Sequence, residues 1–131
     1  MIGEDVTFRA AANEGRLARL NEGTGQPSIL VFGTTRPSTA GGAAGDSALC
    51  VIQLNRPAGS VNAGGELELT PLEDALILLS GAAQWCRVLT GNGDFCFDMD
   101  AGLEGSSAEA ILSDTTLFAG GSVRLLSCIL G

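Results

Sequence analysis

QWCRVLTGNGDFCFDM, residues 84–99, consists of two runs of alternating side chains on either side of a glycine-containing loop. Such alternation is typical of a β-strand with one buried face. The loop at residues 90–93 can close a hairpin, because Asn and Gly tolerate positive φ. In this hairpin we expect Trp85 to share the buried face with Phe95, Phe97 and Met99. The residues expected to point to solvent are Asp94, Asp98 and Asp100.

Short apolar runs of the same kind recur along most of the chain. They cover residues 28–33, 48–54, 66–69, 75–79, 82–89, 94–99, 108–112 and 122–130. Turn-forming clusters rich in Gly and Asn separate them. Several short strands at this spacing favour a sandwich or a small barrel. We predict a mainly β fold, an antiparallel β-sandwich or jelly-roll-like domain with one short helix.

The helix is predicted over residues 5–22, where apolar residues recur at helical spacing before the stop signal Asn21-Glu22-Gly23. A chain of 131 residues has the usual length of one domain, so we predict a single domain over residues 1–131. Residues 34–47, TTRPSTAGGAAGDS, have no apolar period. We expect them to form a flexible, exposed loop that acts as a contact arm.

Charge and composition exclude several classes of function. The net charge of −8 and the pI near 4.2 disfavour a nucleic-acid partner and an anionic membrane surface. No apolar run approaches the roughly 20 residues of a spanning helix, and we expect no secretory signal, because residues 1–19 carry charges throughout. His, Lys and Tyr are absent, which removes the commonest acid–base and Schiff-base groups. We therefore predict no enzymatic activity, no catalytic residues and no cofactor.

The four cysteines, Cys50, Cys86, Cys96 and Cys128, show no C-x-x-C spacing and cannot recruit a His. Each lies inside an apolar run, the usual setting of a buried free thiol. We predict no metal site, and reduced thiols as found in the cytoplasm.

Two groups of carboxylates could be read as sites. Asp94, Asp98, Asp100 and Glu104 resemble a calcium loop only superficially, because the stretch runs through a predicted strand and lacks the EF-hand order of ligands. Glu66 and Glu68 share one face of a strand, as catalytic pairs sometimes do. In both cases a solvated acidic surface is the favoured interpretation.

The predicted interface combines the contact arm with apolar strands. Arg87 shares a strand face with Trp85, and its head either pairs with a carboxylate, which we favour, or anchors an interface. Residues 122–130 carry apolar groups on both faces. We therefore expect both faces to be buried, either against the rest of this domain or against another subunit of a homo-oligomer. The candidate interface residues are Arg36, Pro37, Arg87, Leu126 and Leu130.

Five segments of the chain, taken in their order along the sequence, resemble those of a known protein family. They are residues 16–21 (RLARLN), 29–37 (ILVFGTTRP), 81–88 (GAAQWCRV), 91–93 (GNG) and 119–123 (AGGSV). Together they resemble a family of small structural proteins of tailed bacteriophages and prophages. In that family the middle strand commonly reads Gly-x-Ala-x-Trp-x-Arg, matched here by Gly81, Ala83, Trp85 and Arg87, and a later Asp-Gly pair is replaced here by Asp98-Met99. The resemblance implies a component of the virion and supplies no catalytic residues.

The leading hypothesis is a capsid decoration or cement protein that binds major capsid protein subunits in a virion assembled in the host bacterial cytoplasm. A neck, tail or fibre-associated virion protein is the first alternative. A carbohydrate- or calcium-binding adhesion module is the second, and the sole Trp and the absence of Tyr make it a poor platform for sugars.

Overall fold

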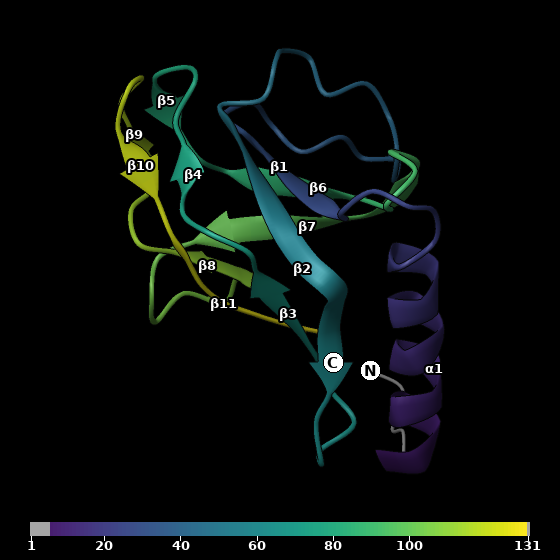
Figure 1. Cartoon of the computed structure of the whole chain (residues 1–131). Helices are drawn as coiled ribbons and strands as arrows, with labels where there is room; N and C mark the ends of the chain where they lie inside the picture. The colour runs from purple at the N-terminus through teal and green to yellow at the C-terminus, as the bar shows by residue number, and fades with distance from the viewer. Residues whose placement is uncertain (1–5, 131) are drawn as a thin grey trace.

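The computed structural model describes residues 6–130, and within them it contains one α-helix and eleven β-strands (Figure 1). The helix α1 spans Val6–Leu20. The strands are β1 (Ser28–Phe32), β2 (Cys50–Val61), β3 (Leu67–Pro71), β4 (Ala75–Leu76), β5 (Gly81–Ala82), β6 (Trp85–Leu89), β7 (Phe95–Gly102), β8 (Ala110–Leu112), β9 (Thr116–Leu117), β10 (Ser122–Val123) and β11 (Leu125–Leu130). The mainly β fold with one short helix is confirmed. The predicted helix boundary at residue 5 lies outside the described residues.

Seven of these strands close into a barrel in the order β1-β2-β3-β11-β8-β7-β6, where the sequence predicted a sandwich or jelly roll. Neighbouring strands are antiparallel except β7 and β8. Closure depends on the long strand β2, which pairs with β1 along its first half and with β3 further on, across a register shift between Leu54 and Gly59. Such a shift bends a strand and increases its twist, which allows one sheet to curl onto itself. Gly59 is required at this bend, because a Cβ there would lie 1.9 Å from the Glu68 carbonyl oxygen.

Two short sheets, β4–β10 and β5–β9, extend the barrel at one side. Figure 1 shows them together at the upper left, away from α1. Each pairs only two residues per strand. The predicted continuous runs 75–79 and 122–130 are therefore divided, with their first residues in these small sheets.

The barrel interior is the hydrophobic core. Its fully buried side chains include Ile29, Ile52, Leu54, Leu67, Cys86, Val88, Met99, Leu112 and Cys128. Burying one such aliphatic side chain contributes about 1.5–3 kcal/mol before entropy costs. Alternate residues of the strands supply this core, as period-2 patterning requires.

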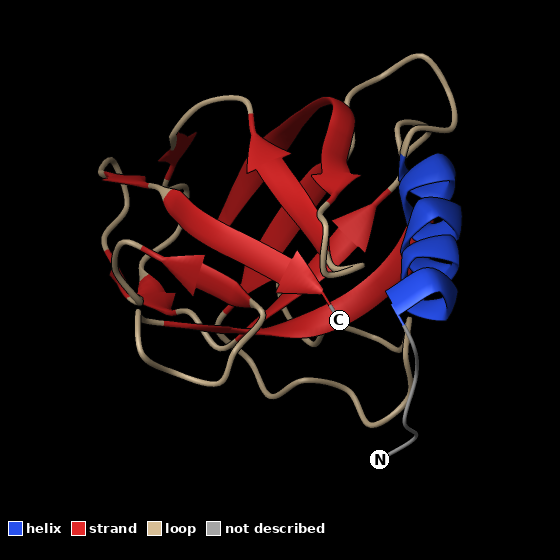
Figure 2. Cartoon of the chain, turned by 90° about the horizontal axis from the view of Figure 1, so that it is seen from below, coloured by secondary structure: helices blue, strands red, loops and turns tan. Residues whose placement is uncertain are grey.

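Helix α1 lies along the outside of the barrel beside β2 and β3 (Figure 2). Its buried residues are Asn13 and Leu20. Asn13 donates from Nδ2 to the Gly65 carbonyl oxygen at 2.7 Å and to the Leu130 carbonyl oxygen at 3.2 Å. One side chain thus joins the helix to the β2–β3 turn and to the end of β11.

The hairpin of β6 and β7 exists as predicted, but its faces differ from the prediction. Pairing begins with Leu89 opposite Phe95, and then shifts by one residue, so that Arg87 lies opposite Asp98. A slip of one residue moves the following side chains to the other face. Met99 and Phe97 therefore face the core with Cys86 and Val88, and the expected solvent position of Asp98 is wrong, because its side chain is only 2% exposed.

Candidate interaction surfaces

The outer face of β1, β6 and β7 carries a packed group that we call the covered cluster: Phe32, Trp85, Arg87, Phe95 and Asp98. The Phe32 and Trp85 rings stack with centroids 4.5 Å apart. The Arg87 guanidinium carbon lies 5.1 Å from the Trp85 ring centroid and 5.5 Å from that of Phe95. Arg87 Nε donates to Asp98 Oδ1 at 2.9 Å, and Nη2 donates to Oδ2 at 3.2 Å. The Arg87 side chain, which the sequence left between a structural pair and an interface anchor, makes the pair.

The loop of residues 34–47 lies over this cluster and is bonded to it. Arg87 Nη2 donates to the Gly42 carbonyl oxygen at 2.6 Å, and the Gly41 N–H donates to Asp98 Oδ2 at 3.1 Å. Trp85 Nε1 donates to Thr34 Oγ1 at 3.1 Å. The segment predicted as a contact arm therefore covers the chain's own Trp85, which is fully buried outside the barrel.

Of the predicted interface residues, the structure gathers Arg36, Pro37 and Arg87 on this side of the molecule. Arg36 Nη1 donates to Asp100 Oδ1 at 3.0 Å, and both side chains are about half exposed, at 43% and 58%. Pro37 is half-buried. An exposed pair of this kind contributes about 0–1 kcal/mol, so Arg36 is held only loosely by its partner.

The other two predicted residues, Leu126 and Leu130, lie on β11, on a different surface. Leu126 is 47% exposed, whereas Leu130 is partly buried against the core. β11 pairs with β8 across an irregularity between Leu125 and Ser127. Leu126 falls at this irregularity, outside the regular pairing, with its side chain exposed beside a surface hollow.

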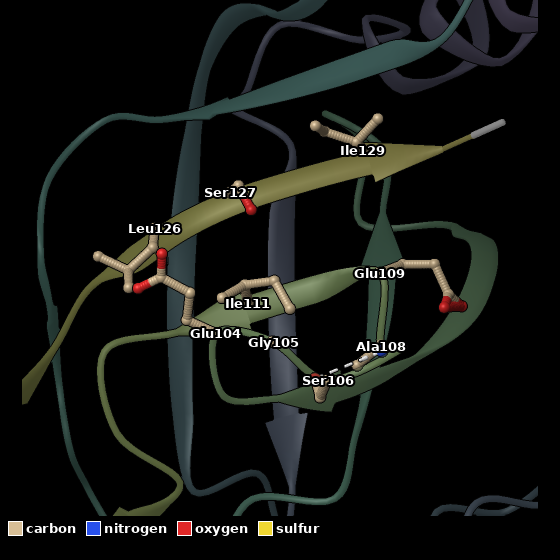
Figure 3. A pocket seen from close by; sticks show the side chains of 9 residues that line it. All are labelled: Glu104, Gly105, Ser106, Ala108, Glu109, Ile111, Leu126, Ser127 and Ile129. Atoms are coloured by element: carbon tan, nitrogen blue, oxygen red, sulfur yellow. Dashed lines mark hydrogen bonds between the residues drawn. The ribbon is translucent and has the colours of Figure 1, made fainter.

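This hollow, which we call the β11 groove, has a volume of about 560 Å³ (Figure 3). Ile111 of β8 and Leu126 and Ile129 of β11 line it with apolar surface, and the loop of residues 104–109 forms the opposite wall. Figure 3 shows the Glu104 and Glu109 carboxylates at opposite ends, with Ile111 between them. Neither carboxylate has an ion-pair partner within residues 6–130. The groove is apolar in its middle and negative at its ends.

A second exposed surface, which we call the apolar end, comprises Leu76, Leu78, Leu79 and Phe118. Their exposed fractions are 60%, 56%, 42% and 67%. The segments that carry them are joined by hydrogen bonds from the Ile77 N–H to the Gly121 carbonyl and from the Gly120 N–H to the Ile77 carbonyl, at 2.8 and 2.9 Å. This surface was not predicted from the sequence, although the alternation of Leu76 and Leu78 with the buried Ala75 and Ile77 indicates it.

The carboxylates singled out as possible calcium ligands do not converge. Asp98 and Asp100 bind Arg87 and Arg36, and Glu104 lies in the wall of the β11 groove. Glu68, one of the two carboxylates that could be read as a catalytic pair, accepts a hydrogen bond from Asn62 Nδ2 at 3.1 Å. Within residues 6–130, no group of three or more carboxylates and thiols is placed to hold a metal ion.

The thiols are held in their neutral form. Burial raises the pKa of Cys50 to about 11 and that of Cys128 to about 12, and it also raises the pKa values of Cys86 and Cys96. Cys128 Sγ lies 3.5 Å from Met99 Sδ in the core. Since the thiolate is the nucleophile, these cysteines act as packing groups.

No helix within residues 6–130 has the length and apolar character needed to cross a bilayer. We compared the chain with protein-family models, with curated proteins and with solved structures, and none of them matches it.

Proposed function

We propose that the protein is a non-enzymatic structural component of a tailed-bacteriophage particle, a capsid decoration or cement protein that binds between major capsid protein subunits. The observation that carries this proposal is the pair of exposed surfaces on one small barrel, the apolar end and the β11 groove. A protein that joins neighbouring subunits needs more than one adhesive surface. The virion as the site of action comes from the resemblance of the sequence to phage structural proteins.

The apolar end has the properties of a contact surface. Leu76, Leu78 and Phe118 are each more than half exposed, and apolar side chains gathered on a protein surface are typical of contact sites. Covering it contributes on the order of 25 cal/mol per Å² of apolar area before the entropy costs of association. Repetition of one weak contact over a particle makes the sum strong.

The polar chemistry of the chain favours binding over catalysis. Four of the carboxylates are paired with arginines, in the pairs of Glu22, Asp74, Asp98 and Asp100. The thiols are protonated at neutral pH, because burial raises the pKa of each. The alternative of a carbohydrate-binding module is disfavoured, since Trp85, the sole Trp, is fully buried and offers no surface on which a sugar could stack.

The copy number of the protein in purified particles, measured by quantitative mass spectrometry against the major capsid protein, tests the proposal. One copy per capsid subunit, or per few subunits, is the expected result. One copy per several tens of subunits would assign the protein to the neck, tail or fibre, and its absence from particles would refute a virion role.

A further inference from the structure

We infer that the β11 groove binds a protein segment in which an apolar side chain is flanked by Lys or Arg residues. The inference deepens the proposed function and rests on it for the class of partner, another protein of the virion. The chemistry of the groove itself is tested below without any virion protein.

The floor and ends of the groove define the occupant. Ile111, Leu126 and Ile129 offer an apolar floor, and Leu126 and Ile129 are 47% and 41% exposed. The volume of about 560 Å³ lies within the usual range of ligand sites, about 300–1,000 Å³. An apolar side chain seated on this floor would leave its neighbours in the segment close to the two ends of the groove.

The ends of the groove are negative, and their two carboxylates form no ion pair with the described part of this chain. Glu104 and Glu109 lie at opposite ends (Figure 3), and neither pairs with an arginine within residues 6–130. Arg16, which lines the adjacent smaller hollow with Glu109, donates to Asn13 Oδ1 at 2.6 Å. Complementary charge on a partner steers association and excludes wrong partners. The missing positive charge is therefore expected from the occupant.

The groove continues across β11. On the other side of the strand, a hollow of about 250 Å³ shares Leu126, Ser127 and Ile129 and is bounded by Glu68 and Pro71 of β3. β3 and β11 pair only at Glu68–Ile129 and Leu67–Leu130, so their surfaces separate beside Leu126. The site thus extends over both sides of one strand and suits a peptide rather than a small molecule.

A second copy of this chain is a poor occupant. The chain contains no Lys, and its net charge is −8. Each of its arginines already donates to a group of its own chain: Arg9 to Gly64, Arg16 to Asn13, Arg19 to Glu22, Arg36 to Asp100, Arg56 to Gly25, Arg87 to Asp98 and Arg124 to Asp74. Two copies meeting at this groove would bring like charges together, which disfavours association.

The test is an NMR titration of the ¹⁵N-labelled full chain with three acetylated, amidated model peptides of equal length. One alternates Arg and Leu, one alternates Glu and Leu, and one alternates Arg and Ser. We expect only the Arg–Leu peptide to shift the amide signals of Ile111, Leu126 and Ile129 in a saturable way. Equal shifts with the Glu–Leu peptide, shifts elsewhere only, or shifts that depend on protein concentration without peptide would overturn the inference.

Variants separate the groove from the general negative charge of the protein. Glu104→Gln with Glu109→Gln is expected to weaken binding of the Arg–Leu peptide about two- to tenfold, as expected for two partly exposed charge pairs. Glu14→Gln with Glu73→Gln makes the same change of charge at exposed positions outside the groove, and should leave the affinity unchanged. Equal loss in both double variants would mean that only net charge matters, and would refute the site.

The failure of this inference can be told apart from the failure of the proposed function. Peptide binding at the groove, together with the absence of the protein from purified particles, would support the inference about the groove and refute the virion role. Incorporation of the Glu104/Glu109 variant into particles at the level of the unaltered protein, with no peptide binding, would do the reverse.

Discussion

Replacing Asp98 with Ala should destabilise the protein far more than replacing Asp100 with Ala, two residues further along the same strand. Both carboxylates pair with an arginine, so the two variants remove the same kind of group. They differ in burial: the Arg87 and Asp98 side chains are 14% and 2% exposed, whereas those of Arg36 and Asp100 are 43% and 58% exposed.

The expected loss can be worked out from the contacts. Removing one partner of a buried ion pair costs about 3–5 kcal/mol, because the other charge is left buried and uncompensated. Arg87 keeps its bond to the Gly42 carbonyl and its stacking on Trp85, which moves the value to the lower end. The Gly41 N–H also loses its acceptor, Asp98 Oδ2. We expect a loss of about 3 kcal/mol for Asp98→Ala and of about 0–1 kcal/mol for Asp100→Ala.

Urea unfolding of both variants, followed by far-UV circular dichroism and by Trp85 fluorescence, measures this difference. The double variant Arg87→Met with Asp98→Leu leaves no charge in the cluster, and should recover at least about 1 kcal/mol relative to Asp98→Ala. Equal losses for Asp98→Ala and Asp100→Ala would refute the argument from burial.

Four further sets of variants and conditions test the fold and the proposed surfaces. Gly59→Ala should lower the free energy of unfolding by at least about 2 kcal/mol, because a Cβ at this position would lie 1.9 Å from the Glu68 carbonyl oxygen. Gly15→Ala, at a helical position where an added Cβ would meet nothing within 4 Å, should raise it by about 0.5–1 kcal/mol in the same urea assay. Cys128, with a pKa of about 12, should be alkylated by iodoacetamide at about pH 8 roughly a thousandfold more slowly than free cysteine, as followed by mass spectrometry of the folded protein. Because burial raises the pKa of Cys50 from 9.0 to about 11 and also raises the pKa of the other three thiols, the stability that depends on their protonation is full below about pH 9 and is lost as the pH rises through 11, so the urea midpoint should fall across this range. Leu78→Ser with Phe118→Ser should lower incorporation into particles at an unchanged melting temperature, whereas Val6→Ser, an exposed apolar residue on α1, should not; equal incorporation of the Leu78/Phe118 variant would contradict a role for the apolar end.

Local signals in the sequence located most of the secondary structure. The β-branched run at residues 28–33 became β1, and the alternation and turn of residues 84–99 became the β6–β7 hairpin. Turn residues and side-chain alternation act over a few positions, so they are readable without knowledge of the fold. The covered cluster was half predicted, because the tendency of Arg87 to pair with a carboxylate was recognised but its partner was not.

The closure of the barrel and the faces of its strands could not be predicted in this way. Leu67 pairs with Leu130 across nearly half of the chain, and the parallel contact of β7 with β8 follows a loop with no apolar period. The face of Trp85 was decided by a shift of one residue, which alternation alone cannot reveal. The β11 groove likewise combines two segments, residues 104–111 and 126–129, that only strand pairing brings together.

The two proposed contact surfaces differ in charge, and in the proposed assembly this difference would give them different parts. The apolar end contains four aliphatic or aromatic side chains and no carboxylate, so its contribution to binding should depend little on ionic strength. The β11 groove pairs an apolar floor with Glu104 and Glu109, and its attraction to a basic segment should weaken as salt screens the exposed charges. Raising the salt concentration should therefore release contacts made through the groove while contacts through the apolar end persist. A decoration protein built in this way would recognise its position on the shell by charge and remain there by burial of apolar surface.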